Sequence, residues 1–210
     1  MRKIGIFGGT FNPVHYGHLR VALECKMTLA LDEMRMMICA QPPHRAHPDV
    51  TAQQRLAMLQ LGLQQSNELI LDNRELEREG PSYSVDTLKS LKSDYPDSAL
   101  FMVIGSDSFQ SLDTWHCWEE ILDLCNIVIA RRPDNLSDEE SRMGQLLRDR
   151  FVDTTSKTDA FFAGKIIPVG VSQLEISATA IRDMIRGGMS PQYLLPENVL
   201  NFIKEQGLYK

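Results

Sequence analysis

The sequence lacks any hydrophobic run close to the ~20 residues that a helix needs to span a bilayer. Its opening stretch, "MRKIGIFGG", has too short an apolar run for a signal peptide, so we expect a cytoplasmic protein with no membrane partner. The sequence also lacks an excess of basic charge, because 22 Lys and Arg stand against 28 Asp and Glu, for a formal net charge of −6. Binders of long nucleic acids usually present a basic field. The charge balance argues against a nucleic-acid partner but allows a small anion held by a local basic cluster.

The cysteines, Cys25, Cys39, Cys117 and Cys125, form no CxxC pair and no zinc-ribbon spacing. Three of them fall in or beside apolar segments, so we expect buried free thiols. The composition, 43% hydrophobic and 24% charged, is ordinary for a globular protein. A chain of 210 residues is long enough for one large domain with a small appendage.

Apolar runs alternate with helical patterns along the chain. The apolar runs predict strands at residues 3–7, 34–40, 68–72, 99–105, 126–130 and 165–170. Helices are predicted at 17–31, after Thr51, from about Ser84, around the tryptophans, at 134–150, and twice after the last strand. Nearly continuous apolar strands separated by helices indicate a parallel sheet covered on both faces. We therefore predict an α/β, doubly wound, Rossmann-like fold forming a single domain over 1–210, with a core at about 1–170 and a helical C-terminal part at about 171–210.

Two polar loops are expected to meet at one point of this sheet. Ligands of doubly wound sheets bind beyond the carboxyl ends of the strands, where the strand order reverses. The first strand ends in "GGTFNPVHYGH" and the strand that starts the second half ends in "GSDSF" (105–109). Gly8 and Gly9 would let the backbone approach a phosphate closely, although a tight structural turn would also use them. The G-x-G-x-x-G fingerprint of dinucleotide-binding proteins is absent from this loop.

Two histidines, His15 and His18, favour the phosphate site over the turn. His18 falls at the start of a predicted helix, whose amino end attracts anions. Two imidazoles can donate hydrogen bonds to phosphate oxygens that gain charge as a P–O bond breaks. The alternatives are a structural pair or a zinc site, but zinc needs at least three protein ligands and no carboxylate or thiol is suitably spaced.

Two motifs of the sequence resemble the signatures of a known enzyme superfamily. "GTFNPVHYGH" resembles the T/HxGH signature of the nucleotidyltransferase superfamily, and "ISATAIR" (176–182) matches its partner motif ISSTxIR. From the residues alone, Ser177 or Thr179 can cap a helix whose free amides, with Arg182 one turn on, suit phosphates. An ordinary helix cap and a solvated arginine would explain the same residues. Members of the superfamily transfer a nucleotide from ATP or CTP to a phosphate.

Motifs in the middle of the chain select a branch of this superfamily. "PPHR" (42–45), "PSYSVDTL" (81–88), "GSDSFQSLDTWHCWEEI" (105–121) and "IARRP" (129–133) resemble bacterial nicotinate-nucleotide adenylyltransferases, and the similarity extends from residue 3 to the end. The resemblance implies adenylyl transfer from ATP to nicotinate mononucleotide in NAD biosynthesis, giving deamido-NAD and pyrophosphate. It also implies Mg²⁺ carried by the ATP phosphates, with no dedicated protein ligands. Assembly into a homo-oligomer stays open.

The resemblance assigns roles to individual positions. Catalysis falls to His15, His18 and Arg182. The ATP-binding positions are Gly8, Gly9, Thr10, Phe11, His15, His18, Gly105, Asp107, Ile176, Ser177, Thr179 and Arg182. The positions for nicotinate mononucleotide are Gly9, Thr10, His44, Arg45, Tyr83, Ser84, Asp107, Trp115, His116 and Arg132. A tryptophan face suits a flat pyridinium ring, although core packing is the common fate of tryptophan.

Some positions depart from the family pattern. Asn12 stands where Asp is frequent, Arg45 where Lys is frequent, and Ser84 where Thr is frequent. Ala178 replaces a frequent Ser, which removes one hydroxyl donor, and His116 replaces a frequent Tyr. Three alternatives remain at this stage: another nucleotidyltransferase of the same fold, such as one acting on phosphopantetheine, a non-catalytic nucleotide sensor, and a Rossmann dehydrogenase.

Overall fold

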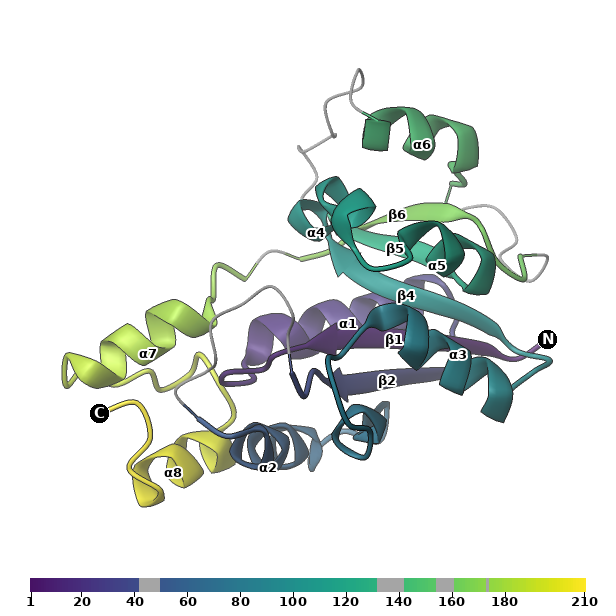
Figure 1. The fold of residues 1–210 in the computed structure, drawn as a ribbon. Coiled ribbons are helices and arrows are strands. Elements are labelled where there is room, and N and C mark those ends of the chain that lie inside the picture. Colours follow the sequence, from purple (N-terminus) through teal and green to yellow (C-terminus); the bar gives the residue numbers. More distant parts are fainter. Residues whose placement is uncertain (42–49, 132–141, 154–160, 173) are drawn as a thin grey trace.

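The computed structural model describes residues 1–41, 50–131, 142–153, 161–172 and 174–210. Its centre is a parallel sheet in the order β3-β2-β1-β4-β5-β6 (Figure 1). The strands are β1 (Lys3–Gly9), β2 (Glu33–Ile38), β3 (Leu69–Asp72), β4 (Ala99–Gly105), β5 (Asn126–Arg131) and β6 (Ile166–Gly170). The predicted doubly wound α/β fold is confirmed.

Helices connect successive strands and extend beyond the last one. They are α1 (Tyr16–Thr28), α2 (Ala52–Leu63), α3 (Ser84–Asp94), α4 (Ser106–Gln110), α5 (Trp118–Leu124), α6 (Arg142–Arg150), α7 (Ala178–Arg186) and α8 (Glu197–Glu205). Two short 3-10 helices, η1 (Arg74–Leu76) and η2 (Leu112–Thr114), lie in the connections. None of the helices in the described ranges is long and apolar enough to cross a membrane.

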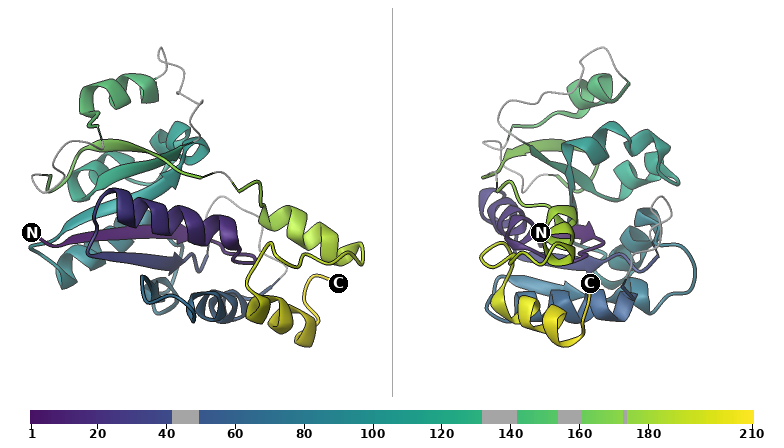
Figure 2. Two further views of the ribbon diagram at one scale, coloured as in Figure 1. Left: turned by 180° about the vertical axis from the view of Figure 1, so that it is seen from behind. Right: turned by 90° about the vertical axis from the view of Figure 1, so that its left-hand side faces the viewer.

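The sheet separates two hydrophobic cores because side chains alternate between the faces of each strand. Along β4, Phe101 and Val103 join the core that contains residues of α1, α2, α7 and α8, whereas Leu100 and Met102 join the core under α3, α4 and α5. Figure 2 shows the same two layers of helices from behind and from the side. Both faces are covered, which explains the nearly continuous apolar strands.

The strand order reverses between β1 and β4. These strands pair in parallel from Lys3 opposite Ala99 to Phe7 opposite Val103, while β2 lies on the other side of β1. The loops that follow β1 and β4 therefore leave the sheet at the same edge, as the sequence predicts. Helix α7 lies beyond the carboxyl end of β1 (Figures 1 and 2).

Local sequence signals predict the capping residues of two helices, whereas the predicted end of one strand differs from the structure. Thr51 caps α2 in a full capping box with Gln54, and the Ser177 side chain accepts from the amide of Ala180 at the start of α7. The strand predicted at 34–40 ends at Ile38, and only 142–150 of the helix predicted at 134–150 lies in the described residues. The division into a core and a C-terminal part stays a prediction.

The expectation of buried thiols is wrong for one cysteine. Cys25 and Cys125 are buried and Cys39 is half-buried, but Cys117 is exposed, and all of them are free. Cys117 adopts a left-handed conformation (φ 50°) just before α5, in the loop after Trp115. The tryptophans of this segment, Trp115 and Trp118, still pack against the core, so the exposure is confined to His116 and Cys117 between them.

Candidate active site

The two loops at the switch point leave open space above the sheet. A Cβ atom built on Gly8, or on Gly105 at the end of β4, would meet no heavy atom within 4 Å. Gly9 differs, since a Cβ there would lie 2.9 Å from the ring of Phe11. A ligand can therefore approach the backbone at Gly8 and Gly105. At Gly9, the absence of a side chain leaves room for the ring of Phe11.

His15 and His18 form a stacked pair at the start of α1. His15 is the N-cap residue and His18 the third residue of the helix, so both rings lie at its amino end. Their ring centroids are 3.7 Å apart with an interplanar angle of 25°. The buried Phe11 ring contacts His18 edge-on at 5.1 Å and 87°. Phe11 is predicted to bind ATP. Because its side chain packs against His18, only its backbone can face a ligand.

Burial holds both imidazoles in the neutral form. Desolvation lowers the pKa of His15 to about 4, and desolvation together with the neighbouring His15 lowers the pKa of His18 to about 3. The Nδ1 atoms of both rings are buried without a hydrogen-bond partner among the described residues. Buried polar atoms are normally paired. The pair thus combines two unpaired ring nitrogens with the amino end of a helix, a position that favours anions.

Gly17, which lies between the two histidines in the sequence, leaves room for the ring of His15. A Cβ atom on Gly17 would lie 3.0 Å from Nδ1 and Cε1 of His15 and 3.5 Å from the carbonyl oxygen of Ile176. Sequence reasoning assigned Gly17 no role, although the glycine of the T/HxGH signature falls on it. The same contact places the start of the "ISATAIR" motif directly against α1.

Arg182 connects the two motifs. Its Nη1 donates to the carbonyl oxygen of Asn12 at 2.8 Å, across 170 residues, and its Nη2 donates to Thr179 Oγ1 at 3.2 Å. Ser177 is exposed and caps α7, while Ala178, which lacks the hydroxyl frequent in the family, is the first residue of that helix. The motifs from the two ends of the chain meet beside the loop that follows β1.

Tyr209 supports the same loop from the C-terminal segment. Its hydroxyl donates to Asn12 Oδ1 at 2.6 Å, and its ring is buried in the core. Asn12 is thus held at its backbone by Arg182 and at its side chain by Tyr209. Sequence reasoning missed Tyr209, because no local signal marks a contact between residues 197 positions apart.

The positions expected to bind the pyridine ring also come together. The rings of Tyr83 and His116 lie 4.3 Å apart at 33°, although 33 residues separate them. Ser84 is the first residue of α3, and Trp115 is half-buried at the edge of the core under α3 and α5. Trp115 thus packs on the core and is partly exposed, and its role in binding the pyridine ring stays a prediction.

Asp107 lies in the first turn of α4 and is exposed, so its carboxylate can accept hydrogen bonds from a ligand. His44, Arg45 and Arg132, the predicted basic cluster, lie outside the described residues.

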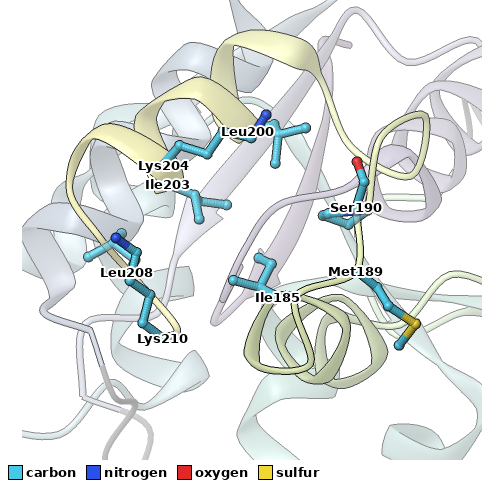
Figure 3. Close-up of a pocket in the computed structure, with 10 residues that line it drawn as sticks. Ile185, Met189, Ser190, Leu200, Ile203, Lys204, Leu208 and Lys210 are labelled. Carbon is cyan, nitrogen blue, oxygen red and sulfur yellow. The ribbon is translucent and has the colours of Figure 1, made fainter.

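A pocket of about 270 Å³ opens between α7 and α8, where Ile185 faces Leu200 and Ile203 (Figure 3). Lys204 and Lys210 complete its rim, and it contains none of the residues predicted to bind substrates.

In the described part of the chain, no group of three or more His, Cys, Asp or Glu side chains could hold a metal ion.

The doubly wound sheet, the histidine pair at its switch point and the bond from Arg182 to the loop after β1 are the features expected of a nucleotidyltransferase. The family model described as cytidylyltransferase-like matches residues 6–184. The chain is 43% identical to a probable nicotinate-nucleotide adenylyltransferase of Hydrogenovibrio crunogenus, over 100% of this chain and 98% of that protein. It is 45% identical to the probable nicotinate-nucleotide adenylyltransferase of Pseudomonas syringae, over 100% of this chain and 94% of that one.

Among solved structures, the fold matches that of the nicotinic acid mononucleotide adenylyltransferase of Plasmodium falciparum complexed with NaAD. The TM-score is 0.77 at 19% identity, covering 100% of this chain and 98% of that one. At this identity the likeness establishes the fold alone. The family model and the full-length relatives show the family: the chain belongs to the nicotinate-nucleotide adenylyltransferase family of cytidylyltransferase-like proteins.

Proposed function

We propose that the chain transfers the adenylyl group of ATP to nicotinate mononucleotide, giving deamido-NAD and pyrophosphate, at the site formed by the loop after β1 and the start of α7. The observation that carries this proposal is the bond from Arg182 to the carbonyl of Asn12, because it joins the two phosphate-binding motifs. The names of the full-length relatives support the choice of substrates.

The reaction needs positioning and charge stabilisation rather than a covalent intermediate. The phosphate of nicotinate mononucleotide is already an anion, so one of its oxygens can attack the α-phosphorus of ATP in line while the bond to pyrophosphate breaks. His15 and His18 donate to the α-phosphate oxygens, whose charge grows in the transition state. Both rings are neutral in the free protein, and a neutral imidazole can donate from one of its ring nitrogens. The negative charge of the approaching triphosphate raises the pKa of both rings and so favours their protonation.

Arg182 and Thr179 would hold the departing pyrophosphate. The guanidinium uses one donor on Asn12 and one on Thr179, and its remaining donors suit phosphate oxygens. The free amides at the start of α7 add to the same attraction. Mg²⁺ would enter as part of the substrate MgATP, bound to phosphate oxygens and water, and would offset the triphosphate charge.

The nicotinate mononucleotide would lie between Tyr83, Trp115 and His116. Aromatic faces stack on a flat cationic ring, and backbone amides near Ser84 and His116 would bind its carboxylate. Asp107 would accept from ribose hydroxyls, and His44, Arg45 and Arg132 would bind the substrate phosphates. Gly8, Gly9, Thr10, Gly105 and Ile176 would contribute backbone to the ATP subsite.

A substrate panel that records pyrophosphate release tests the proposal. With MgATP, we expect nicotinate mononucleotide to give the fastest release, ahead of nicotinamide mononucleotide and phosphopantetheine. Release only with phosphopantetheine would establish a different transferase of the same fold. ATP binding without release from any acceptor would indicate a sensor, and hydride transfer would indicate a dehydrogenase.

A further inference from the structure

Arg55 is a charged side chain in the interior that the reaction described above does not use. It lies in the first turn of α2, is 1% exposed, and is among the largest fully buried side chains. No carboxylate among the described residues pairs with it, and burial lowers the pKa of its guanidinium. Removing a charge from water without an opposite charge is costly, so its partners must supply the compensation.

Those partners are backbone carbonyls from two different loops. Nη1 donates to the carbonyl oxygens of Thr10 at 2.8 Å and of Cys39 at 2.7 Å, and Nη2 donates to that of Ala40 at 3.0 Å. Thr10 belongs to the phosphate loop after β1, whereas Cys39 and Ala40 follow β2. Beyond the last backbone bond between the two strands, from the amide of Cys39 to the carbonyl of Gly9 at 2.9 Å, the Arg55 guanidinium therefore bridges the segments that follow β1 and β2.

The segment after β2 continues the connection to the pyridine subsite. The amides of Ala40 and Gln41 both donate to Ser82 Oγ, at 3.1 and 3.0 Å, and the amide of Ser82 donates back to the carbonyl of Gln41 at 3.0 Å. Ser82 directly precedes Tyr83, whose ring packs on His116. An unbroken path thus runs from the phosphate loop through Arg55 and Ser82 to the nicotinate side.

We propose that Arg55 is a positioning residue that sets the distance between the ATP subsite and the nicotinate mononucleotide subsite, with Ser82 as the second link. This inference rests on the proposed function and names a residue that acts through Thr10 and Tyr83 rather than on substrate. In-line attack depends on the distance and angle between the two substrates, and a misplacement of about 1 Å can lower the rate on the order of a hundredfold. The signature of such a residue is a loss of kcat with little change in the affinity for either substrate alone.

The test compares R55M, R55K and S82A with the wild-type chain. We would measure kcat and KM by pyrophosphate release, and the Kd of nicotinate mononucleotide and of α,β-methylene ATP separately by calorimetry. For R55M we expect kcat to fall about thirtyfold while each Kd changes by less than about threefold. R55K keeps the charge, but its single ammonium nitrogen cannot replace the two guanidinium nitrogens that bond the three carbonyl oxygens. Its kcat should therefore lie between those of R55M and the wild-type chain. S82A should show the same pattern to a smaller degree.

R35M is the matched control. Arg35 has a side chain 13% exposed and bonds Glu33, Asp72 and Tyr95, none of which is assigned to a substrate. Its removal should lower the melting temperature without lowering kcat at a temperature where the variant is folded.

Wild-type kcat in folded R55K would overturn the inference, because charge alone would then suffice. Unchanged kcat in S82A, or losses in R55M that match its losses of single-substrate affinity, would overturn it as well. S82A keeps the test decisive if R55M fails to fold. Failure of the proposed function would instead appear in the wild-type chain, as no pyrophosphate release with nicotinate mononucleotide.

Discussion

Arg182 Nη1 donates to the carbonyl oxygen of Asn12 at 2.8 Å, so a helix near the end of the chain is bonded to the loop after the first strand. The bond brings the motif at residues 176–182 into contact with the loop after β1, although 170 residues separate the two bonded residues. A Cβ atom on Gly17 of α1 would also lie 3.5 Å from the carbonyl oxygen of Ile176, so the starts of α1 and α7 are neighbours.

Arg182→Ala should lower kcat/KM for ATP on the order of a hundredfold, because it removes charged donors to the departing pyrophosphate and frees the Asn12 loop. Arg182→Lys keeps the charge but loses the planar fork, and should lie between wild type and Ala. Steady-state kinetics with each substrate varied in turn would measure this. An unchanged kcat/KM for ATP in Arg182→Ala would remove the arginine from the reaction.

His18→Ala should reduce turnover on the order of a hundredfold or more while the fold stays intact, because the α-phosphate loses a positioned donor. Circular dichroism and thermal melting would verify the fold, and single-turnover pyrophosphate release would report the chemistry. His116→Ala is the comparison, since His116 is exposed on the pyridine side and should affect KM for nicotinate mononucleotide more than kcat. Near-normal turnover of His18→Ala would contradict the mechanism.

Gly17→Ala should separate stability from activity. Alanine favours a helix over glycine by about 1 kcal/mol, which offsets strain from a Cβ 3.0 Å from the His15 ring. We therefore expect a free energy of unfolding close to wild type and a turnover lowered about tenfold, because the His15 ring must shift. Denaturant titration and kinetics on the same preparation would measure both. A variant with wild-type turnover would show that the stacking is not needed.

The histidine pair should make stability depend on pH. The folded protein keeps His15 neutral down to about pH 4 and His18 down to about pH 3, whereas unfolded histidines accept protons below about pH 6.5. The unfolded state then binds more protons, so the free energy of unfolding falls as pH drops below 6.5, by up to about 2.7 kcal/mol per pH unit. Well above pH 6.5 the histidines are neutral in both the folded and the unfolded state, so this loss of stability is absent.

Urea titrations between pH 7 and pH 4.5 would measure that slope. His18→Gln should reduce it by about half, because one of the two buried groups no longer titrates. Equal slopes in wild type and His18→Gln would show that His18 is not held neutral by burial.

Tyr209→Phe should destabilise the protein by about 1 kcal/mol, because Asn12 Oδ1 loses its donor while the ring still fills the core. Turnover should fall a few-fold, since the Asn12 loop becomes less restrained. A double-mutant cycle with Asn12→Ala measures the coupling. Additive effects of the two changes would contradict a direct interaction.

The architecture and the first-motif residues could be predicted from sequence because their signals are local. Apolar runs separated by helical patterns identify a parallel sheet, and the expected strand order places β1 beside β4. His15 and His18 were recognisable because a turn does not need two histidines at a strand end. The prediction that Arg182 belongs to the same site required the motif resemblance, since nothing in "ISATAIR" alone distinguishes a phosphate site from a capped helix.

Other parts of the site had no local signal. Arg55 follows two glutamines in a helix with apolar neighbours, where an arginine usually faces solvent, and only the structure shows that it is buried. Tyr209 reaches Asn12 across almost the whole chain. Cys117 was expected inside because cysteine is commonly buried, but its left-handed backbone turns it outward.

The central claim is that one triphosphate lies between the histidine pair and Arg182. The most direct measurement is a crystal structure of the protein with α,β-methylene ATP and nicotinate mononucleotide. The account predicts α-phosphate oxygens within hydrogen-bond distance of the His15 and His18 rings, and the terminal phosphates on Arg182 and the first turn of α7. A triphosphate bound away from either the histidines or the arginine would contradict it.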